Sequence, residues 1–414
     1  MSTTKPGSVG VDEALPAAAP AEEEERFSLG ALVKRLGQGE LGSLRVLIVL
    51  AIVWIIFAIA NSNFLTATNL TNLALQIAAV GTISIGVVFV LLLGEIDLSV
   101  GAVSGLTSAI MAVLSVKHGW NPYLAMLAAL LAGAAIGLLQ GSLVTWLTIP
   151  SFVVTLAGLL TWQGAQLKVL GETGTVNITD PAITNLANKF LADWLGWLFA
   201  IVAIAALLLA PLNERRRRMA AALETEPLSS LVVRVGAAAI AIVAAVYVVD
   251  QDRGVPVSLV ILVGLCAFFD YIVRRTRYGR HILAVGGNEE AARRVGIKTG
   301  RIKTTVFVLA STLAAAGGIL AASRLLAVNQ SSGGSDLLLL AIAGPVIAGV
   351  SLFGGRGSVW GALLGALVIG SISNGMDLLG LESSVKYMVT GGVLAFAVII
   401  DALGRKQRAV RGRA

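Results

Sequence analysis

The sequence predicts an all-α membrane protein with about twelve membrane-spanning helices. Of its 414 residues, 56% are hydrophobic and only 13% are charged, whereas soluble domains carry about 25% charged residues. The mean hydropathy of +0.85 excludes a soluble enzyme, because such a chain could not cover its own surface with polar groups. A single cysteine, Cys266, excludes a disulfide scaffold, and two histidines leave little for metal chemistry, so we expect no metal site.

Twelve stretches approach the length of about 20 apolar residues that a helix needs to cross the bilayer core. Very short connections separate the second stretch from the third and the fourth from the fifth. Ten or eleven full spans with re-entrant pieces therefore fit nearly as well. The predicted spans are 44–61, 70–93, 99–116, 122–147, 149–170, 194–212, 231–249, 256–273, 305–323, 337–353, 359–380 and 385–403.

The distribution of Lys and Arg predicts the orientation. With the N-terminus in the cytoplasm, 24 basic residues fall on the cytoplasmic side and six on the other, as the positive-inside rule requires. Both termini are thus expected in the cytoplasm, as a mostly disordered tail over 1–43 and a basic tail over 404–414. Between them, residues 44–403 form the transmembrane domain. The Ala-, Pro- and Glu-rich start of the chain cannot form a core and does not resemble a signal peptide.

Few ionisable groups lie inside the predicted spans, which argues against a proton- or voltage-driven machine. Glu95 and Asp97, at the junction of the second and third spans, are the exceptions. They could form an ion or substrate site. The favoured alternative is that Asp97 is a helix cap at the N-terminus of the third span, where a carboxylate satisfies free N–H groups.

Polar side chains in two later spans are candidates for a translocation path. Thr155, Gln163 and Gln166 share one helical face of the fifth span. Amides in hydrocarbon need partners, so this face either lines a hydrophilic path for a hydroxylated solute or bonds to neighbouring helices. Asn374, at the end of a row of small residues in the eleventh span, is a fourth candidate, although helix packing explains it at least as well.

Two further patterns concern the backbone. Gly344 and Pro345 lie inside the tenth span and predict a helix break, because Pro lacks a backbone donor. The G-A-x-x-G spacing of residues 101–105 recurs at 361–365 and hints at a parallel internal repeat. The glycine-rich stretch 354–358 fits no nucleotide-binding motif, so it is interpreted as a tight turn.

The predicted cytoplasmic loop over 274–304 contains a short helix with well-defined ends. Asn288 is a good N-cap, and Gly296 suits the position after the last turn. Acidic residues stand in the first turn and basic ones in the last, in agreement with the helix dipole. The helix over 289–295 is therefore expected to dock onto a partner, with Ala291 and Ala292 at the contact because small side chains allow close approach.

Four motifs then follow one another in a recognisable order: residues 96–101, 149–156, 278–297 and 351–358. They closely resemble permease subunits of bacterial monosaccharide ABC importers, the ribose, xylose and galactose class, and 278–297 resembles the family's coupling loop. Glu95 replaces a glycine of the family pattern, Gln163 and Gly164 stand where an Arg-Gly pair is common, and 213–255 looks additional. In these features the chain is most similar to the xylose branch.

The resemblance implies a transporter subunit without enzymatic activity, in the bacterial cytoplasmic membrane. Two copies would form the path for a monosaccharide, together with cytoplasmic ATP-binding subunits and an extracytoplasmic sugar-binding protein. The chain would bind no cofactor and no nucleic acid, and its partner subunits would use the ATP. The residues implied in coupling to the ATPase are Arg280, Asn288, Glu289, Glu290, Ala291, Ala292, Arg293 and Gly296.

Two alternatives remain within transport. Related permeases import nucleosides or branched-chain amino acids. A self-contained transporter could instead use Glu95 or Asp97 for proton coupling. A membrane-embedded enzyme finds no support, since no nucleophile–base pair or metal-ligand set is visible.

Overall fold

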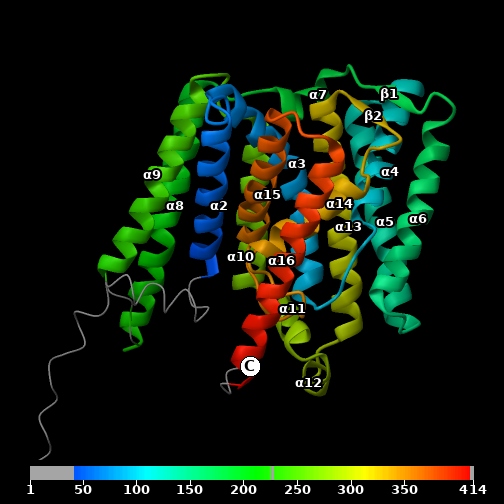
Figure 1. Ribbon diagram of the computed structural model, residues 1–414. Helices are drawn as coiled ribbons and strands as arrows, with labels where there is room; N and C mark the ends of the chain where they lie inside the picture. The colour runs from blue at the N-terminus through cyan, green and yellow to red at the C-terminus, as the bar shows by residue number, and fades with distance from the viewer. Residues whose placement is uncertain (1–41, 224, 226–227, 411–414) are drawn as a thin grey trace, which may run out of the picture.

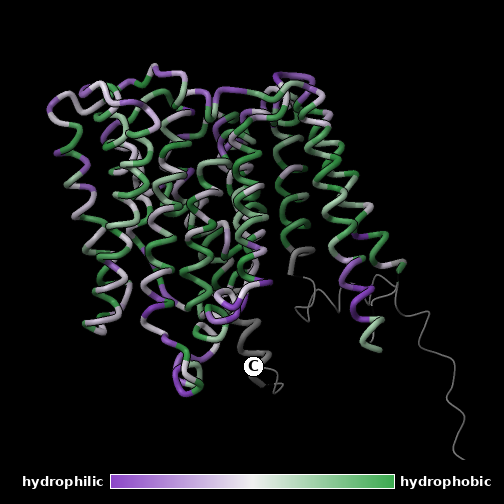
Figure 2. Tube along the Cα trace, turned by 180° about the vertical axis from the view of Figure 1, so that it is seen from behind, coloured by the Kyte–Doolittle hydropathy of each residue, from purple (hydrophilic) through white to green (hydrophobic). Residues whose placement is uncertain are grey.

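The helices of the protein stand side by side, with their ends at two opposite faces of a bundle (Figure 1). The structure is a computed structural model that describes residues 42–223, 225 and 228–410. Hydrophobic residues fill the length of the helices, and hydrophilic ones gather towards the two ends (Figure 2). This is the pattern expected of helices that cross a bilayer.

The first half of the bundle runs from α2 to α9. Its elements are α2 (Gly42–Ala60), α3 (Ala67–Leu92), α4 (Val100–Ala112) with a π-helical turn (Val113–Lys117), α5 (Pro122–Trp146), α6 (Ser151–Leu170), β1 (Thr175–Asn177), α7 (Pro181–Asn188), α8 (Asp193–Ala220) and α9 (Leu228–Asp250). The second half comprises α10 (Val257–Arg275), α11 (Arg277–Gly287), α12 (Glu289–Arg294), α13 (Thr299–Leu325), β2 (Ala327–Asn329), α14 (Ser335–Ile347), α15 (Trp360–Leu378) and α16 (Ser383–Val410).

Each of the twelve predicted spans overlaps a helix. Within the described residues, eight helices are long and apolar enough to cross a membrane: α3, α4 with its π-helical turn, α5, α8, α9, α10, α13 and α15. The protein is thus a polytopic, all-α membrane protein. Helix α3 lies at the centre of the bundle, because 89% of its most apolar stretch is buried inside the protein. Helices α8 and α9 lie at the edge, where only 11% of the corresponding stretch of each is buried.

Several boundaries differ from those predicted. Helix α8 continues to Ala220, so arginines 215–218 lie on its last turns rather than in a loop. Helix α16 continues to Val410 and includes most of the predicted basic tail, while residues 1–41 and 411–414 lie outside the described residues. The loop predicted over 274–304 contains the end of α10, all of α11 and α12, and the start of α13.

Helix α14 includes Gly344 and Pro345, where a break is predicted, and ends shortly after them, inside the predicted span 337–353. The helix continues through both residues and ends two residues later, at Ile347, so 348–353 are not helical. Pro345 cannot donate to the carbonyl of Ala341. That carbonyl instead accepts a hydrogen bond of 3.0 Å from the hydroxyl of Ser84 on α3. A neighbouring helix thus satisfies the group that the proline leaves free.

The two strands form a small antiparallel sheet in which Val176 pairs with Val328. The sheet and α7 lie at one end of the bundle, and α12 projects from the other (Figure 1). The end of α16 lies at the end that carries α12. The sheet and α12 therefore mark the two opposite ends of the bundle.

Candidate functional site: a projecting helix and a polar cavity

The short helix predicted in the loop is present as α12, which is one residue shorter than expected. The side chain of Asn288 accepts a hydrogen bond of 2.9 Å from the backbone N–H of Ala291, as an N-cap does. Gly296 follows the helix with a φ of 87°, a conformation that glycine adopts without strain. The local sequence thus determines both ends of α12.

The exposed face of α12 differs from the predicted one. Ala292 is only 4% exposed and packs into the main hydrophobic core, whereas Ala291 is exposed. Val295, directly after the helix, is 77% exposed although it is apolar. Any docking surface therefore centres on Ala291 and Val295. The prediction that Ala292 contacts a partner is wrong, since that side chain holds α12 against its own chain.

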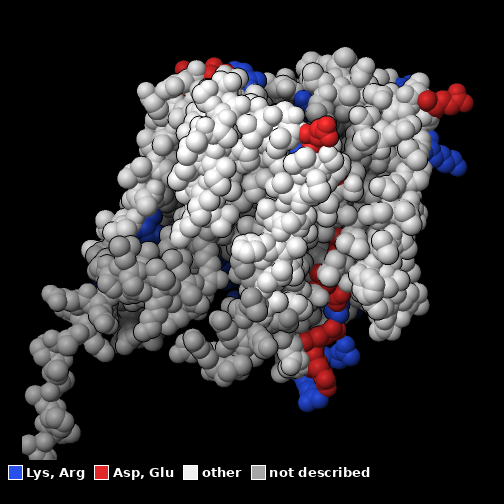
Figure 3. All heavy atoms as spheres, in the orientation of Figure 1, with Lys and Arg blue, Asp and Glu red and all other residues white. Residues whose placement is uncertain are grey.

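Charged side chains surround this projecting helix (Figure 3). Glu290 pairs with Arg294 at 2.5 Å, and both are well exposed. Glu289 pairs with Arg293 at 3.1 Å and with Lys303 of α13 at 2.7 Å. The exposed pairs contribute little to stability. The Lys303 contact is less exposed and fixes α12 to the start of α13.

The pKa of Glu289 reflects these contacts. Partial burial alone would raise it, but the hydrogen bonds and charge of Lys303, with the hydrogen bond from Arg293, lower the pKa below its ordinary value. A carboxyl group with a lowered pKa stabilises the fold above its ordinary pKa, and this stabilisation is lost as the pH falls through the lowered value. The contact is therefore complete at neutral pH.

Helix α11, which the sequence pattern does not predict, positions α12 and carries the exposed Arg280. Its end meets the end of α3 so closely that a Cβ atom at Gly286 would collide with the carbonyl oxygen of Leu92. The same carbonyl accepts a hydrogen bond of 2.9 Å from the N–H of Gly355. The projecting helix is thus joined through α11 to the connection between α3 and α4.

That connection contains Asp97, whose role differs from the predicted one. The N-cap of α4 is Ser99, and Asp97 lies two residues before it. The Asp97 carboxylate accepts hydrogen bonds from the N–H and the hydroxyl of Ser99, at 2.8 and 2.6 Å. Ser99 also bonds to Gln140 of α5. Asp97 therefore orders the turn before α4, and the prediction that it is itself the cap is wrong.

A polar cavity of about 570 Å³ lies in the half of the bundle opposite α12. Helices α3, α4, α6, α13, α14 and α16 and the segment after β2 contribute to it. Its polar and charged lining residues are Gln76, Ser104, Ser108, Gln163, Arg324, Gln330, Ser331, Ser332, Ser335, Asp336 and Tyr387. Hydroxyl and amide groups can both donate and accept hydrogen bonds, so the lining suits a small solute that is rich in hydroxyl groups.

Of the four predicted path residues, only Gln163 lines this cavity. Thr155 is fully buried and bonds to the backbone of Leu98 in the α3–α4 connection, at 3.1 Å. Gln166 donates to the carbonyls of Asn329 and Ser332. The amide of Asn374 pairs with that of Asn69. The last three side chains connect segments of the protein instead of lining the cavity.

Most of the cavity lining does not stand out in the sequence. Ser104 and Ser108 are four residues apart on α4 and so share one helical face, a signal that could have found them. Arg324, at the end of α13, has no such periodic partner. The residues after β2 belong to a loop, whose position the sequence pattern does not indicate.

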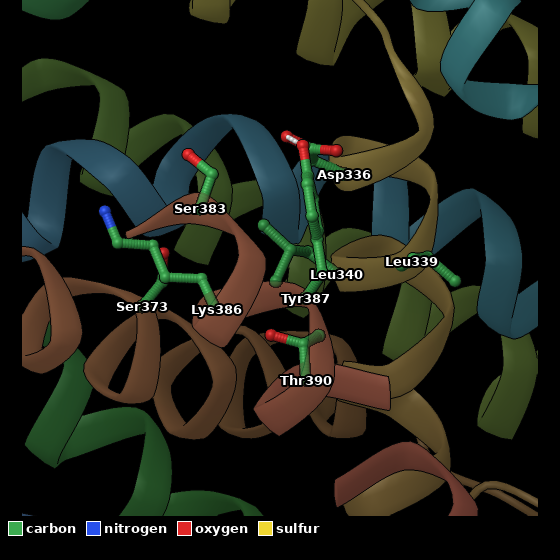
Figure 4. Close-up of a pocket in the computed structure, with 8 residues that line it drawn as sticks. All are labelled: Asp336, Leu339, Leu340, Ser373, Ser383, Lys386, Tyr387 and Thr390. Carbon is green, nitrogen blue, oxygen red and sulfur yellow. Dashed lines mark hydrogen bonds between the residues drawn. The ribbon is translucent and has the colours of Figure 1, made fainter. Parts of the chain in front are cut away.

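A smaller cavity of about 90 Å³ lies between α14, α15 and α16 (Figure 4). The hydroxyl of Tyr387 donates a hydrogen bond of 2.7 Å to the carboxylate of Asp336 there. Both residues also line the larger cavity. The Asp336–Tyr387 pair therefore joins α14 to α16 along the boundary of the two cavities.

Known proteins resemble the chain over nearly its whole membrane domain. The model of the family described as branched-chain amino acid transport system / permease component matches residues 69–398. The xylose transport system permease protein XylH of Haemophilus influenzae is 34% identical over 362 residues, covering 87% of this chain and 96% of that protein. Its Escherichia coli K12 counterpart is 35% identical, with coverages of 84% and 88%.

A second group of relatives is slightly more distant. The ribose import permease protein RbsC of Bacillus subtilis is 31% identical over 379 residues, covering 92% of this chain and 96% of that protein. No solved structure matches the chain. The extent of the family match, the identity to these permeases and the apolar helix bundle together lead to one conclusion: the chain belongs to this family of transport-system permease components and is a multi-pass membrane protein.

Proposed function

We propose that the chain is the membrane subunit of an ATP-binding-cassette importer for a monosaccharide, with xylose as the first candidate. The observation that carries the proposal is the combination of a hydroxyl- and amide-lined cavity with a capped helix that projects from the other end of the bundle. A neutral sugar can exchange its hydrogen bonds with water for bonds to this lining. The names of the xylose and ribose permeases support the same class of solute.

The driving force comes from separate ATP-binding subunits, which dock on α12 and adjacent residues. The exposed Ala291 and Val295 form the apolar centre of this docking surface, and Glu290, Arg293 and Arg294 form its polar rim. Asn288, Glu289 and Gly296 set the shape of α12, and Arg280 extends the surface onto α11. The chain itself binds no cofactor, and its partners use the ATP.

The finer features of the assembly belong to the same proposal. Twelve spans, cytoplasmic termini and a homodimer with a sugar-binding protein on the far side fit the resemblance and the basic residues near α12. Helices α4 and α15, which share the G-A-x-x-G spacing, run in the same direction, as a parallel repeat requires (Figure 1). Gln163 borders the sugar path in the cavity.

The test is sugar uptake into proteoliposomes that contain the permease with its ATP-binding subunits and binding protein. Wild-type protein should take up xylose or ribose only with internal ATP, and an uncoupler should have no effect. Val295→Asp should reduce ATPase association at least about tenfold, since a desolvated unpaired charge costs several kcal/mol. Val295→Leu, which keeps an apolar side chain, should associate and transport normally.

Two results would contradict the proposal. One is uptake that persists without ATP and collapses with the uncoupler, which indicates proton coupling. The other is full ATPase association and uptake in the Val295→Asp protein. Gln163→Ala tests the path itself and should raise the KM for uptake while leaving ATPase association unchanged.

A further inference from the structure

A single lysine links the projecting helix to the connection between α3 and α4. The Nζ atom of Lys303, near the start of α13, lies 2.7 Å from Oε1 of Glu95 and 2.7 Å from Oε2 of Glu289. The side chains of Lys303 and Glu95 are only 15% and 17% exposed. An ammonium group has three donors, so one lysine can hold both carboxylates at once.

Each carboxylate belongs to a different segment of the chain. Glu289 is the first residue of α12. Glu95 lies in the α3–α4 connection, where the next residues bond to α6: the N–H of Ile96 donates to Ser151 and that of Leu98 to Thr155. Helices α4 and α6 then carry Ser104 and Gln163 into the polar cavity. A continuous series of contacts thus leads from α12 through Lys303 to the cavity lining.

The Lys303 contacts differ from the exposed pairs on α12. An exposed pair such as Glu290 with Arg294 is easily replaced by water. Water cannot replace the shielded contacts in this way, because a shielded ammonium group that loses its carboxylates is left as an uncompensated charge. A displacement of α12 relative to α13 would therefore either drag the α3–α4 connection along or break a partly buried ion pair.

We propose that Lys303 is a positioning residue for transport, which makes α12, the start of α13 and the α3–α4 connection move as one body. Glu95 and Glu289 are its two partners. Through them, a displacement that a partner imposes on α12 reaches the first turns of α4 and α6 and changes the shape of the cavity. The inference rests on the proposed function, because it requires ATPase subunits that act on α12.

The experiment measures sugar taken up per ATP hydrolysed by the complete complex in proteoliposomes. Lys303→Ala should still assemble and hydrolyse ATP, but its uptake per ATP should fall by roughly 5- to 150-fold, the usual range of coupling between sites. Lys303→Arg, which keeps the charge and can reach both carboxylates, should restore most of the ratio. Arg301→Ala removes an exposed charge two residues earlier on α13 and should match wild type.

Glu95→Gln covers the case in which Lys303→Ala does not assemble, because it leaves the Glu289 contact to Lys303 intact. It should also lower uptake per ATP with normal ATPase association. A wild-type ratio in Glu95→Gln or in an assembled Lys303→Ala complex would overturn the role of Lys303. If the wild-type complex itself shows no ATP-dependent uptake, the proposed function fails instead, so the two failures are distinguishable.

Discussion

At the scale of single residues, the amide pair between α3 and α15 serves helix packing and not transport. Asn69 donates to the side chain of Asn374 at 2.8 Å and accepts from it at 3.0 Å, and both residues are buried. Asn69 also donates to the carbonyl of Phe64. Their hydrogen-bonding groups therefore face each other across a helix interface and are not available to a passing solute.

We expect Asn374→Ala to lower stability without changing the KM for uptake. The substitution leaves the buried oxygen of Asn69 without its donor, which costs about 1–3 kcal/mol. Thermal unfolding in detergent and uptake kinetics measure the two effects separately. Gln163→Ala is the matched comparison, for which we expect the reverse pattern. A raised KM at unchanged stability for Asn374→Ala would place this amide in the path after all.

Thr155 and Gln166 show what the sequence cannot decide at this scale. The sequence identifies them as polar groups in hydrocarbon that need partners, but the partners come from segments far along the chain, such as Ile96 and Asn329. Gln163 and Gln166 share one face of α6, yet only Gln163 lines the cavity. Helical periodicity therefore predicts the face correctly and cannot separate a path residue from a packing residue.

At the scale of elements, Ser84 and Pro345 form a compensating pair. The proline removes the donor that the carbonyl of Ala341 would have had within α14, and the Ser84 hydroxyl replaces it at 3.0 Å. We expect Ser84→Ala to destabilise the protein by about 1–3 kcal/mol, because it leaves a buried carbonyl unpaired. The double variant Ser84→Ala with Pro345→Ala should recover most of that loss, since an alanine in place of the proline would supply a backbone N–H.

Unfolding curves of the four proteins in detergent (wild type, the two single variants and the double variant) measure this interaction as a double-mutant cycle. Pro345→Ala alone should change stability little, because Ser84 already serves the carbonyl. A double variant that is no more stable than Ser84→Ala would show that the hydroxyl does not compensate for the proline.

The sequence predicts the long helices well because their signal is local. A run of apolar residues is enough to locate α3 or α10, and the ends of α12 follow from Asn288 and Gly296. Helix α11 was missed because residues 277–287 contain three glycines, and its burial of Ile282 and Val285 depends on the rest of the bundle. The inward face of α12 was missed for a related reason: a helix of six residues is too short for periodicity to show which side is buried.

At the scale of the whole molecule, α8 and α9 form a hairpin beside the bundle (Figure 1). Ala200, Val246 and Val249 of the hairpin form a small hydrophobic cluster that also contacts the start of α10. Its described residues line neither cavity and are not part of α12. The chain enters and leaves the hairpin at one place, because the N–H of Leu191 donates to the carbonyl of Val255 at 2.9 Å.

We expect the hairpin to be dispensable for transport. Replacing 193–253 by a short Gly-Ser linker joins two neighbouring backbone positions, and removing two helices together keeps the orientation of every later span. Uptake per assembled complex should change by less than about tenfold, equivalent to ~1.4 kcal/mol in activation free energy. Stability should fall, since contacts such as those of Arg253 with Asn72 and Phe190 are lost.

Deleting α9 alone is the contrasting control: it removes an odd number of spans, so α12 should move to the opposite side of the membrane and uptake should cease. Abolished uptake in an assembled, correctly oriented protein without the hairpin would instead make α8 and α9 part of the transport machinery.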